Sequence, residues 1–170
     1  LVLADGPSLA FDLAIDARGF GARAERPERR SEASRRTTGV RGVRGEVIWL
    51  HAPGVALQRP LRLLHPRHRV YIVPRPGDRF VVGASEIESE DRSPVSLRSA
   101  VELMAAAQSV LPELAEARIV HLETNLRPAL PDNEPRIDHQ DGLLRINGLY
   151  RHGWLLAPAL VQDALAALDE

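Results

Sequence analysis

The stretch GLYRHGWLLAP, residues 148–158, decides how the end of this chain folds. It follows a short apolar run at residues 143–146 and leads into an Ala/Leu-rich segment, a pattern that predicts a strand, a glycine-flanked turn and a helix. The first N–H groups of a helix have no partner inside the helix, and the helix dipole makes that end positive. The turn therefore predicts a place for an electron-rich oxygen or a developing negative charge.

Three other segments add to this motif: DLAIDARGFGA at residues 12–22, YIVPR at 71–75 and NLRPALPD at 125–132. In this order, the four segments resemble the C-terminal part of the FAD-dependent amino acid oxidases of the D-amino-acid oxidase superfamily. Within it they are most similar to the glycine oxidases of thiamine biosynthesis. The resemblance covers nearly the whole chain except residues 24–38, an Arg/Glu/Ser-rich stretch expected to be a solvated loop of unknown role.

One part of the family pattern is missing. Family members hold the FAD pyrophosphate on an N-terminal strand, turn and helix with a G-x-G-x-x-G fingerprint. No such fingerprint occurs here, and the first residue is Leu1 rather than Met. The chain is therefore expected to be the C-terminal portion of a longer flavoprotein, or one piece of a split one.

Composition narrows the class of protein. The 170 residues, 44% hydrophobic and 26% charged, are typical of a globular protein with a core. The net charge of −1 and the few aromatic residues disfavour a nucleic-acid partner, although all 22 basic residues are Arg. The absence of Cys excludes disulfides and thiolate chemistry. No apolar run approaches the ~20 residues of a membrane helix, and we expect a cytoplasmic protein.

The order of patterns predicts an α+β or mixed α/β fold. Strands are predicted at residues 1–4, 11–15, 46–51, 61–64, 70–73, 79–84, 118–126 and 143–146. One helix should start at Ser93-Pro94 and end before Pro112, and the last should run over 154–168, with Pro158 as an alternative start. The resemblance implies two lobes. Residues 1–42 and 133–170 would be a partial FAD-binding lobe, and 43–132 a substrate lobe with an antiparallel sheet.

Two residues are candidates for binding substrate. Arg127 offers two parallel N–H donors to a carboxylate, and the matching family residue anchors the amino acid in this way. The alternative for Arg127 is an ion pair with Asp132 or Glu123. Tyr71 can donate a further hydrogen bond to the carboxylate, and its alternative is an aromatic core position.

The resemblance also assigns residues to the flavin. Arg151 would lie beside the ring on the substrate side, which makes it the third catalytic candidate. The cofactor-binding candidates are Gly19, Gly21, Gly148, Arg151, His152, Gly153, Trp154 and Leu155. We assign His152 no acid–base role and expect Trp154 to serve in packing. No metal site is predicted, because the His residues are scattered.

The implied activity is FAD-dependent oxidative deamination of a small, glycine-like amino acid to an imino acid and then a 2-oxo acid, with formation of hydrogen peroxide. Glu86 could favour a basic or amine-bearing substrate, or point away from it. The alternatives are a quinone-linked amino acid dehydrogenase of the same fold and a non-catalytic fragment or subunit of a split flavoprotein. The isolated chain is expected to bind FAD weakly and to be inactive. A homo-oligomer and a missing N-terminal half both remain open.

Overall fold

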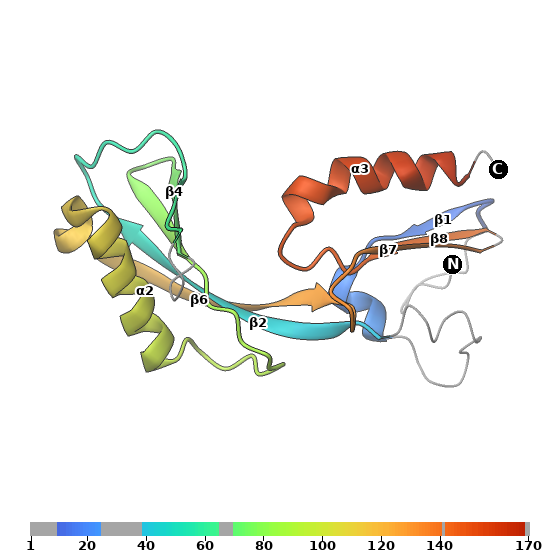
Figure 1. Cartoon of the computed structure of the whole chain (residues 1–170), viewed down its shortest axis with the longest axis horizontal. Coiled ribbons are helices and arrows are strands. Elements are labelled where there is room, and N and C mark those ends of the chain that lie inside the picture. The colour runs from blue at the N-terminus through green and yellow to red at the C-terminus, as the bar shows by residue number, and fades with distance from the viewer. Residues whose placement is uncertain (1–9, 25–38, 65–69, 141, 169–170) are drawn as a thin grey trace. The chain divides into compact units, whose positions relative to one another are not determined.

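The computed structural model describes residues 10–24, 39–64, 70–140 and 142–168 (Figure 1). The chain forms two compact units, Leu1–Gly42 with Arg127–Glu170 and Val43–Leu126. Helices occur together with a five-stranded antiparallel sheet and a smaller mixed sheet, which confirms the predicted mixed α/β class. The strand predicted at residues 1–4 and most of the 24–38 stretch lie outside the described residues.

The unit Val43–Leu126 is built on the five-stranded sheet, in the order β3-β4-β5-β2-β6. These strands are β2 (Arg41–His51), β3 (Leu61–Arg62), β4 (Tyr71–Arg75), β5 (Arg79–Gly83) and β6 (Arg118–Ala129). β4 and β5 form the hairpin predicted from Pro76-Gly77, with Arg75 opposite Arg79. Gly77 and Asp78 have positive φ of 76° and 54°, conformations that Gly and Asp tolerate in tight turns.

The helix α2 (Leu97–Val110) covers this sheet, followed by the 3₁₀ turn η3 (Pro112–Glu116). The core between them consists of Ile48, Leu50, Ala52, Val70, Ile72, Phe80, Val82, Leu103, Ala106, Ala107 and Leu114. The helix ends before Pro112, as predicted. Its predicted start at Ser93 is wrong: Ser96 is the N-cap and accepts from the Ser99 N–H. Ser93 is instead held in a local turn by Asp91, through its N–H and its hydroxyl.

A buried ion pair joins β2 to the start of α2. Glu46 is fully buried, and one of its oxygens accepts from Arg44 Nη2 at 2.7 Å and from the Ser96 N–H at 3.0 Å. Its second oxygen accepts from the Ser85 hydroxyl at 2.9 Å. Burial raises the pKa of Glu46, but hydrogen bonds from Ser99, the Ser96 backbone, Arg44 and Ser85 outweigh it and lower the pKa from 4.5 to about 2. Glu46 is therefore a structural carboxylate.

Arg44 extends the same network to the connection between β5 and α2. Its Nη1 and Nη2 donate to the backbone oxygens of Asp91 and Pro94, both at 2.7 Å. A backbone bridge between Arg44 and Ile87 holds the first part of this connection. The buried Arg44 guanidinium and this backbone bridge thus hold the long segment between β5 and α2 together.

The other unit contains a three-stranded sheet in the order β1-β8-β7, formed by β1 (Ala14–Asp16), β7 (Arg136–Gln140) and β8 (Leu143–Asn147). β1 pairs with β8 in parallel, and β7 pairs with β8 in antiparallel orientation. The 3₁₀ turn η1 (Gly19–Ala24) follows β1, and the helix α3 (Gly153–Ala166) lies along the sheet (Figure 1).

Several predicted boundaries in this unit need correction. The strand predicted at residues 11–15 is only Ala14–Asp16, since that is where the chain pairs with β8. β7 was not predicted, because RIDHQ contains a single apolar residue. Pro158 lies inside α3 and does not mark its start, which is at Gly153.

Candidate functional site

The turn after β1 is shaped by one charged pair. Arg18 donates from Nε to Asp16 Oδ1 at 2.9 Å and from Nη2 to Oδ2 at 2.7 Å, a bidentate contact. The hydrogen bond from the Arg18 side chain is the main reason that the pKa of Asp16 is lowered. Gly19 follows with a φ of +57°, and a Cβ there would lie 3.2 Å from Cγ of Pro128. The chain therefore needs glycine where this turn meets the end of β6.

Asn147 joins this turn to the one after β8. Its side chain is buried; Nδ2 donates to the Gly19 carbonyl at 2.9 Å, and Oδ1 accepts from the Gly148 N–H at 2.8 Å. Because β1 and β8 are parallel, their C-terminal ends lie at one edge of the sheet, and Asn147 connects the two turns there. Sequence reasoning missed this residue. The available signal was a polar side chain at the end of an apolar strand, directly before a glycine.

The second turn packs too closely for any side chain at its first position. Gly148 is buried with a φ of +80°, and a Cβ there would lie 2.8 Å from the Leu130 side chain and 3.1 Å from the Glu134 carbonyl. Glycine is the residue that tolerates both this conformation and this approach. Gly148 is therefore required by the fold, whether or not it also contacts a cofactor.

Tyr150 ties the same turn to the end of β6. Its N–H donates to the Pro128 carbonyl at 3.0 Å, and its φ of +49° is uncommon for a residue with a side chain. Such strain persists only where the surroundings impose it, and it is concentrated at functional sites.

The contacts of Gly19, Asn147 and Tyr150 bring three of the four sequence motifs together within one unit. These motifs are the Gly19 turn, Arg127-Pro128 and the Gly148–Gly153 turn.

The start of α3 is open to a ligand. Its N-cap residue, His152, makes no side-chain capping bond. Within the described part of the chain, the N–H groups of Gly153 and Trp154 have no protein acceptor. Unpaired N–H groups at a positive helix end suit an electron-rich group, such as the oxygen-bearing edge of a flavin ring. The residues present at this end thus fit the cofactor that the sequence indicates.

The packing role predicted for Trp154 is wrong for the described structure. The side chain is 100% exposed, and Leu155 beside it is also exposed. The inner face of α3 is formed by Gly153, Leu156, Ala157, Leu160 and Ala164, at helical spacing. Trp154 and Leu155 lie off that face, so the helix turns both of them toward solvent.

Arg127 is half-buried near the end of β6, directly before Pro128. The carboxylates considered as its alternative partners have other contacts. Asp132 accepts from Arg136 Nη2 at 2.8 Å and from the Glu134 N–H, so it caps a turn. Glu123 accepts from Trp49 Nε1 at 3.1 Å. Each of these two carboxylates therefore has a hydrogen-bond partner of its own.

Tyr71 belongs to the other unit, where it begins β4 opposite Gly83. A Cβ on Gly83 would lie 2.6 Å from the Tyr71 hydroxyl and 2.8 Å from Val47 Cγ1, so the tyrosine ring occupies the space over this glycine. Among the described residues the hydroxyl has no hydrogen-bond partner. A half-buried phenol without a protein partner is available to a ligand.

Two negative observations complete the description. Neither α2 nor α3 has the length and apolarity needed to cross a membrane, and the described residues contain no other candidate. The described His, Asp and Glu residues do not form a group of three that could hold a metal ion.

The parallel strands β1 and β8 both end in glycine turns, and the second turn opens the helix α3. This arrangement is typical of α/β proteins that bind a nucleotide cofactor. In open α/β sheets, nucleotide cofactors bind at that edge. The chain belongs to the FAD dependent oxidoreductase family, whose model matches residues 4–167. This confirms the family inferred from the four motifs.

Named relatives point to one branch of the family. The oxidoreductase of Rhizobium etli named ThiO, for thiamine biosynthesis, is 50% identical over 133 residues, which is 78% of this chain and 41% of the relative. A glycine oxidase of Bacillus licheniformis is 35% identical over 69% of this chain and 31% of its own. The crystal structure of glycine oxidase from Bacillus cereus matches with a TM-score of 0.65 at 30% identity, covering 74% of this chain and 35% of that one. The chain thus spans less than half the length of these relatives.

Replacing Asn147 by Leu should destabilise the protein by about 2–3 kcal/mol, because it removes two hydrogen bonds, one to the part-buried Gly19 carbonyl and one from the buried Gly148 N–H. The free energy of unfolding from denaturant titration measures this loss. Asn125→Ala is the matched control, since the side chain of the exposed Asn125 bonds, among the described residues, only to the next residue in the chain. A loss for Asn147→Leu no larger than that of the control would show that Asn147 does not connect the two turns.

Proposed function

We propose that this chain provides the substrate-binding side and the flavin-ring side of an FAD-dependent oxidase of small amino acids, with glycine as the first candidate. The observation that supports it best is the meeting of Gly19, Arg127-Pro128 and the Gly148–Gly153 turn at one edge of a parallel strand pair. The likeness to ThiO and to glycine oxidases suggests the substrate class.

In this proposal the chain binds the substrate and the cofactor and orients them for the reaction. Arg127 holds the substrate carboxylate through its two parallel N–H groups, and the Tyr71 hydroxyl donates a further hydrogen bond. Arg151 lies beside the ring on the substrate side. Gly19, Gly21 and the N–H groups at the start of α3 hold the cofactor, and that positive helix end stabilises negative charge on it.

FAD, when bound, supplies the redox chemistry. Overall, the amino acid loses two electrons and two protons to become an imino acid, and oxygen takes them up to give hydrogen peroxide. Water then hydrolyses the imino acid to a 2-oxo acid and ammonia. No side chain of this chain needs to act as a general base if the substrate amine arrives neutral.

The first experiment is an FAD titration of the purified chain, followed by flavin fluorescence and the visible spectrum. We expect weak binding, because the G-x-G-x-x-G cradle for the pyrophosphate does not occur in these residues. Submicromolar affinity would contradict this expectation and would show that these residues form a complete flavin site.

A chimera tests the reaction itself. The matched part of the Rhizobium etli relative is replaced by this chain, and the FAD-loaded protein is supplied with glycine. Equal yields of hydrogen peroxide and ammonia are expected. A chimera that holds FAD but oxidises no small amino acid would refute the proposed substrate class. Oxidation that requires an artificial acceptor in place of oxygen would favour the dehydrogenase alternative.

A further inference from the structure

Gly83 is flanked by strands on both sides, in a place where a glycine weakens a sheet. It is the last residue of β5, and it pairs with Tyr71 of β4 on one side and with Val47 of β2 on the other. Its φ is outside the left-handed region, so its backbone conformation does not call for glycine. Lack of space for a side chain is the remaining physical reason, and the surroundings support it.

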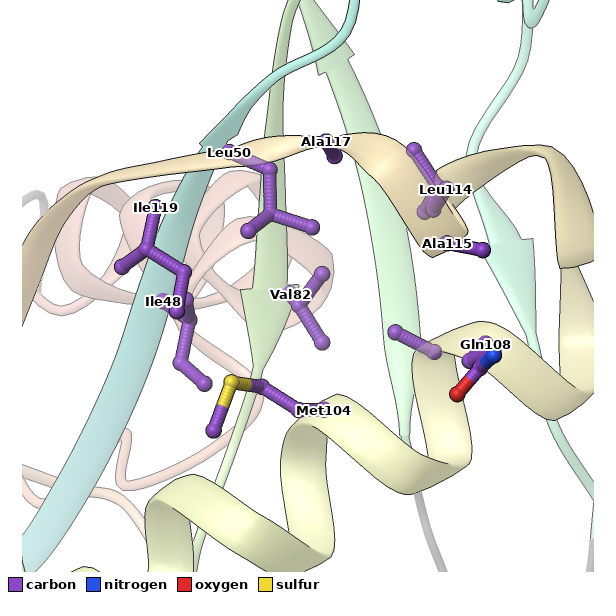
Figure 2. Close-up of a pocket in the computed structure, with 10 residues that line it drawn as sticks. Ile48, Leu50, Val82, Met104, Gln108, Leu114, Ala115, Ala117 and Ile119 are labelled. Atoms are coloured by element: carbon purple, nitrogen blue, oxygen red, sulfur yellow. The ribbon is translucent and has the colours of Figure 1, made fainter.

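The space concerned lies on the face of the sheet opposite to α2. Figure 2 shows Ile48 and Val82 at a cavity of about 240 Å³ between the sheet and α2. Side chains alternate along a strand, so the residues next to Ile48 and Val82 point the other way. Val47, Gly83 and Tyr71 therefore form one row across three strands on the face opposite to α2.

The ring of Tyr71 takes the place of a side chain at position 83. A Cβ on Gly83 would lie 2.6 Å from the Tyr71 hydroxyl, 2.8 Å from its Cζ and 2.8 Å from Val47 Cγ1. Carbon atoms that are not bonded to one another pack at about 3.5–4.0 Å. The hydroxyl end of the phenol thus reaches across β5 to the glycine, and a side chain at position 83 would displace it.

The neighbouring row on the same face has no such gap. There Trp49, Val81 and Val73 lie side by side on the same three strands. Val81 is buried with its side chain in place, so β5 accommodates a branched residue on this face. The glycine is confined to the row of Tyr71, whose hydroxyl has no hydrogen-bond partner among the described residues.

We propose that Gly83 is a positioning residue for the Tyr71 hydroxyl. Its missing side chain lets the phenol lie across β5, which holds the hydroxyl where it can donate to the carboxylate of the substrate. This role rests on the proposed function, in which Tyr71 binds that carboxylate. The alternative is a purely structural pair, in which the aromatic ring covers the glycine and stabilises the sheet. Only the positioning role makes the effect of a change at position 83 depend on the hydroxyl.

The affinity of the FAD-loaded chimera for acetate, read from the flavin spectrum, tests this role. Tyr71→Phe should weaken acetate binding by about tenfold or more, because it removes a hydrogen bond to a charged group. Gly83→Ala should weaken it about as much, since the hydroxyl is displaced. The two changes together should bind acetate within about twofold of Tyr71→Phe alone, because the hydroxyl is already gone. Val81→Ala is the matched control on the same face of β5 and should leave acetate affinity unchanged.

Two further measurements apply if Gly83→Ala does not fold. Adding Val47→Ala removes the other close contact and should restore folding. It should leave acetate affinity low, because the clash with the hydroxyl remains. In the unchanged 170-residue chain, NMR should show a nuclear Overhauser cross-peak between Gly83 Hα and the ring hydrogens of Tyr71.

The outcomes separate this role from the proposed reaction. Unchanged acetate affinity for Gly83→Ala, losses that add to those of Tyr71→Phe, recovery of affinity with Val47→Ala, or absence of the cross-peak would each refute the positioning role. Unchanged affinity for Tyr71→Phe would remove Tyr71 from the proposed site, and the role of Gly83 with it. A chimera that shows the expected acetate affinities but oxidises no small amino acid would count against the proposed reaction alone.

Discussion

Replacing Arg127 by Leu in the FAD-loaded chimera is expected to lower kcat/KM for glycine by about 10²–10⁴-fold. Each hydrogen bond between charged groups contributes about 1.5–3 kcal/mol, and the guanidinium would supply two to the substrate carboxylate. A loss of about 1.4 kcal/mol is tenfold in kcat/KM. Arg127 lies between Leu126 and Pro128, and all three residues belong to β6. The backbone at position 127 should therefore keep its place in the variant. Steady-state kinetics with glycine measure the effect.

Two further variants sharpen this prediction. Arg127→Lys keeps the charge and loses the parallel pair of donors. Its kcat/KM for glycine should therefore lie between that of Arg127→Leu and that of the unchanged chimera. Arg98→Ala removes an exposed guanidinium from α2 and should leave kcat/KM for glycine unchanged. The affinity for acetate, read from the flavin spectrum, should fall in parallel with kcat/KM for Arg127→Leu. An unchanged KM for glycine together with unchanged acetate affinity would place the carboxylate anchor elsewhere.

Local patterns in the sequence were enough to predict the elements that local forces decide. The Pro76-Gly77 pair predicted the hairpin of β4 and β5, and the glycine-flanked stretch from Gly148 predicted a strand, a turn and a helix. In both cases the residues that force the chain to turn lie within a few positions of one another. Backbone conformations available mainly to glycine need no knowledge of the rest of the fold.

Contacts between distant segments could not be predicted in this way. Asn147 bonds to Gly19 from 128 positions away, and nothing near either residue indicates the other. β7 forms because β8 offers it a backbone to pair with, although its own residues are mostly polar. The choice between Ser93 and Ser96 as N-cap was decided by Asp91, which holds Ser93 in a separate turn. Tertiary partners overrode the local signal in each case.

The buried pair in β2 was missed for a different reason. Charged residues in a strand are normally expected at the surface, and Arg44 and Glu46 were not singled out. The sequence did contain a signal, because residues i and i+2 of a strand lie on the same face. An Arg and a Glu at that spacing can pair within the strand, and here the pair also binds the start of α2.

Replacing Glu46 by Gln should lower the free energy of unfolding by about 3–5 kcal/mol, the usual cost of removing one partner from a buried ion pair. The guanidinium of Arg44 would remain buried beside an amide that donates as well as accepts. Denaturant titration at neutral pH measures the loss. Arg136→Gln is the matched control, because the Arg136–Asp132 pair at 2.8 Å is exposed and should contribute less than about 1 kcal/mol.

The dependence of this loss on pH identifies the carboxylate as its cause. The pKa of Glu46 is about 2 in the folded protein and 4.5 ordinarily, so its ionised form favours the folded state. That contribution, about 3 kcal/mol, is complete above pH 4.5 and is lost as the pH falls toward 2. The difference in unfolding free energy between wild type and Glu46→Gln should therefore shrink over this range, because protonated Glu46 comes to resemble Gln. A difference that stays constant from pH 7 to pH 2 would mean that altered packing, and not the buried charge, destabilises the variant.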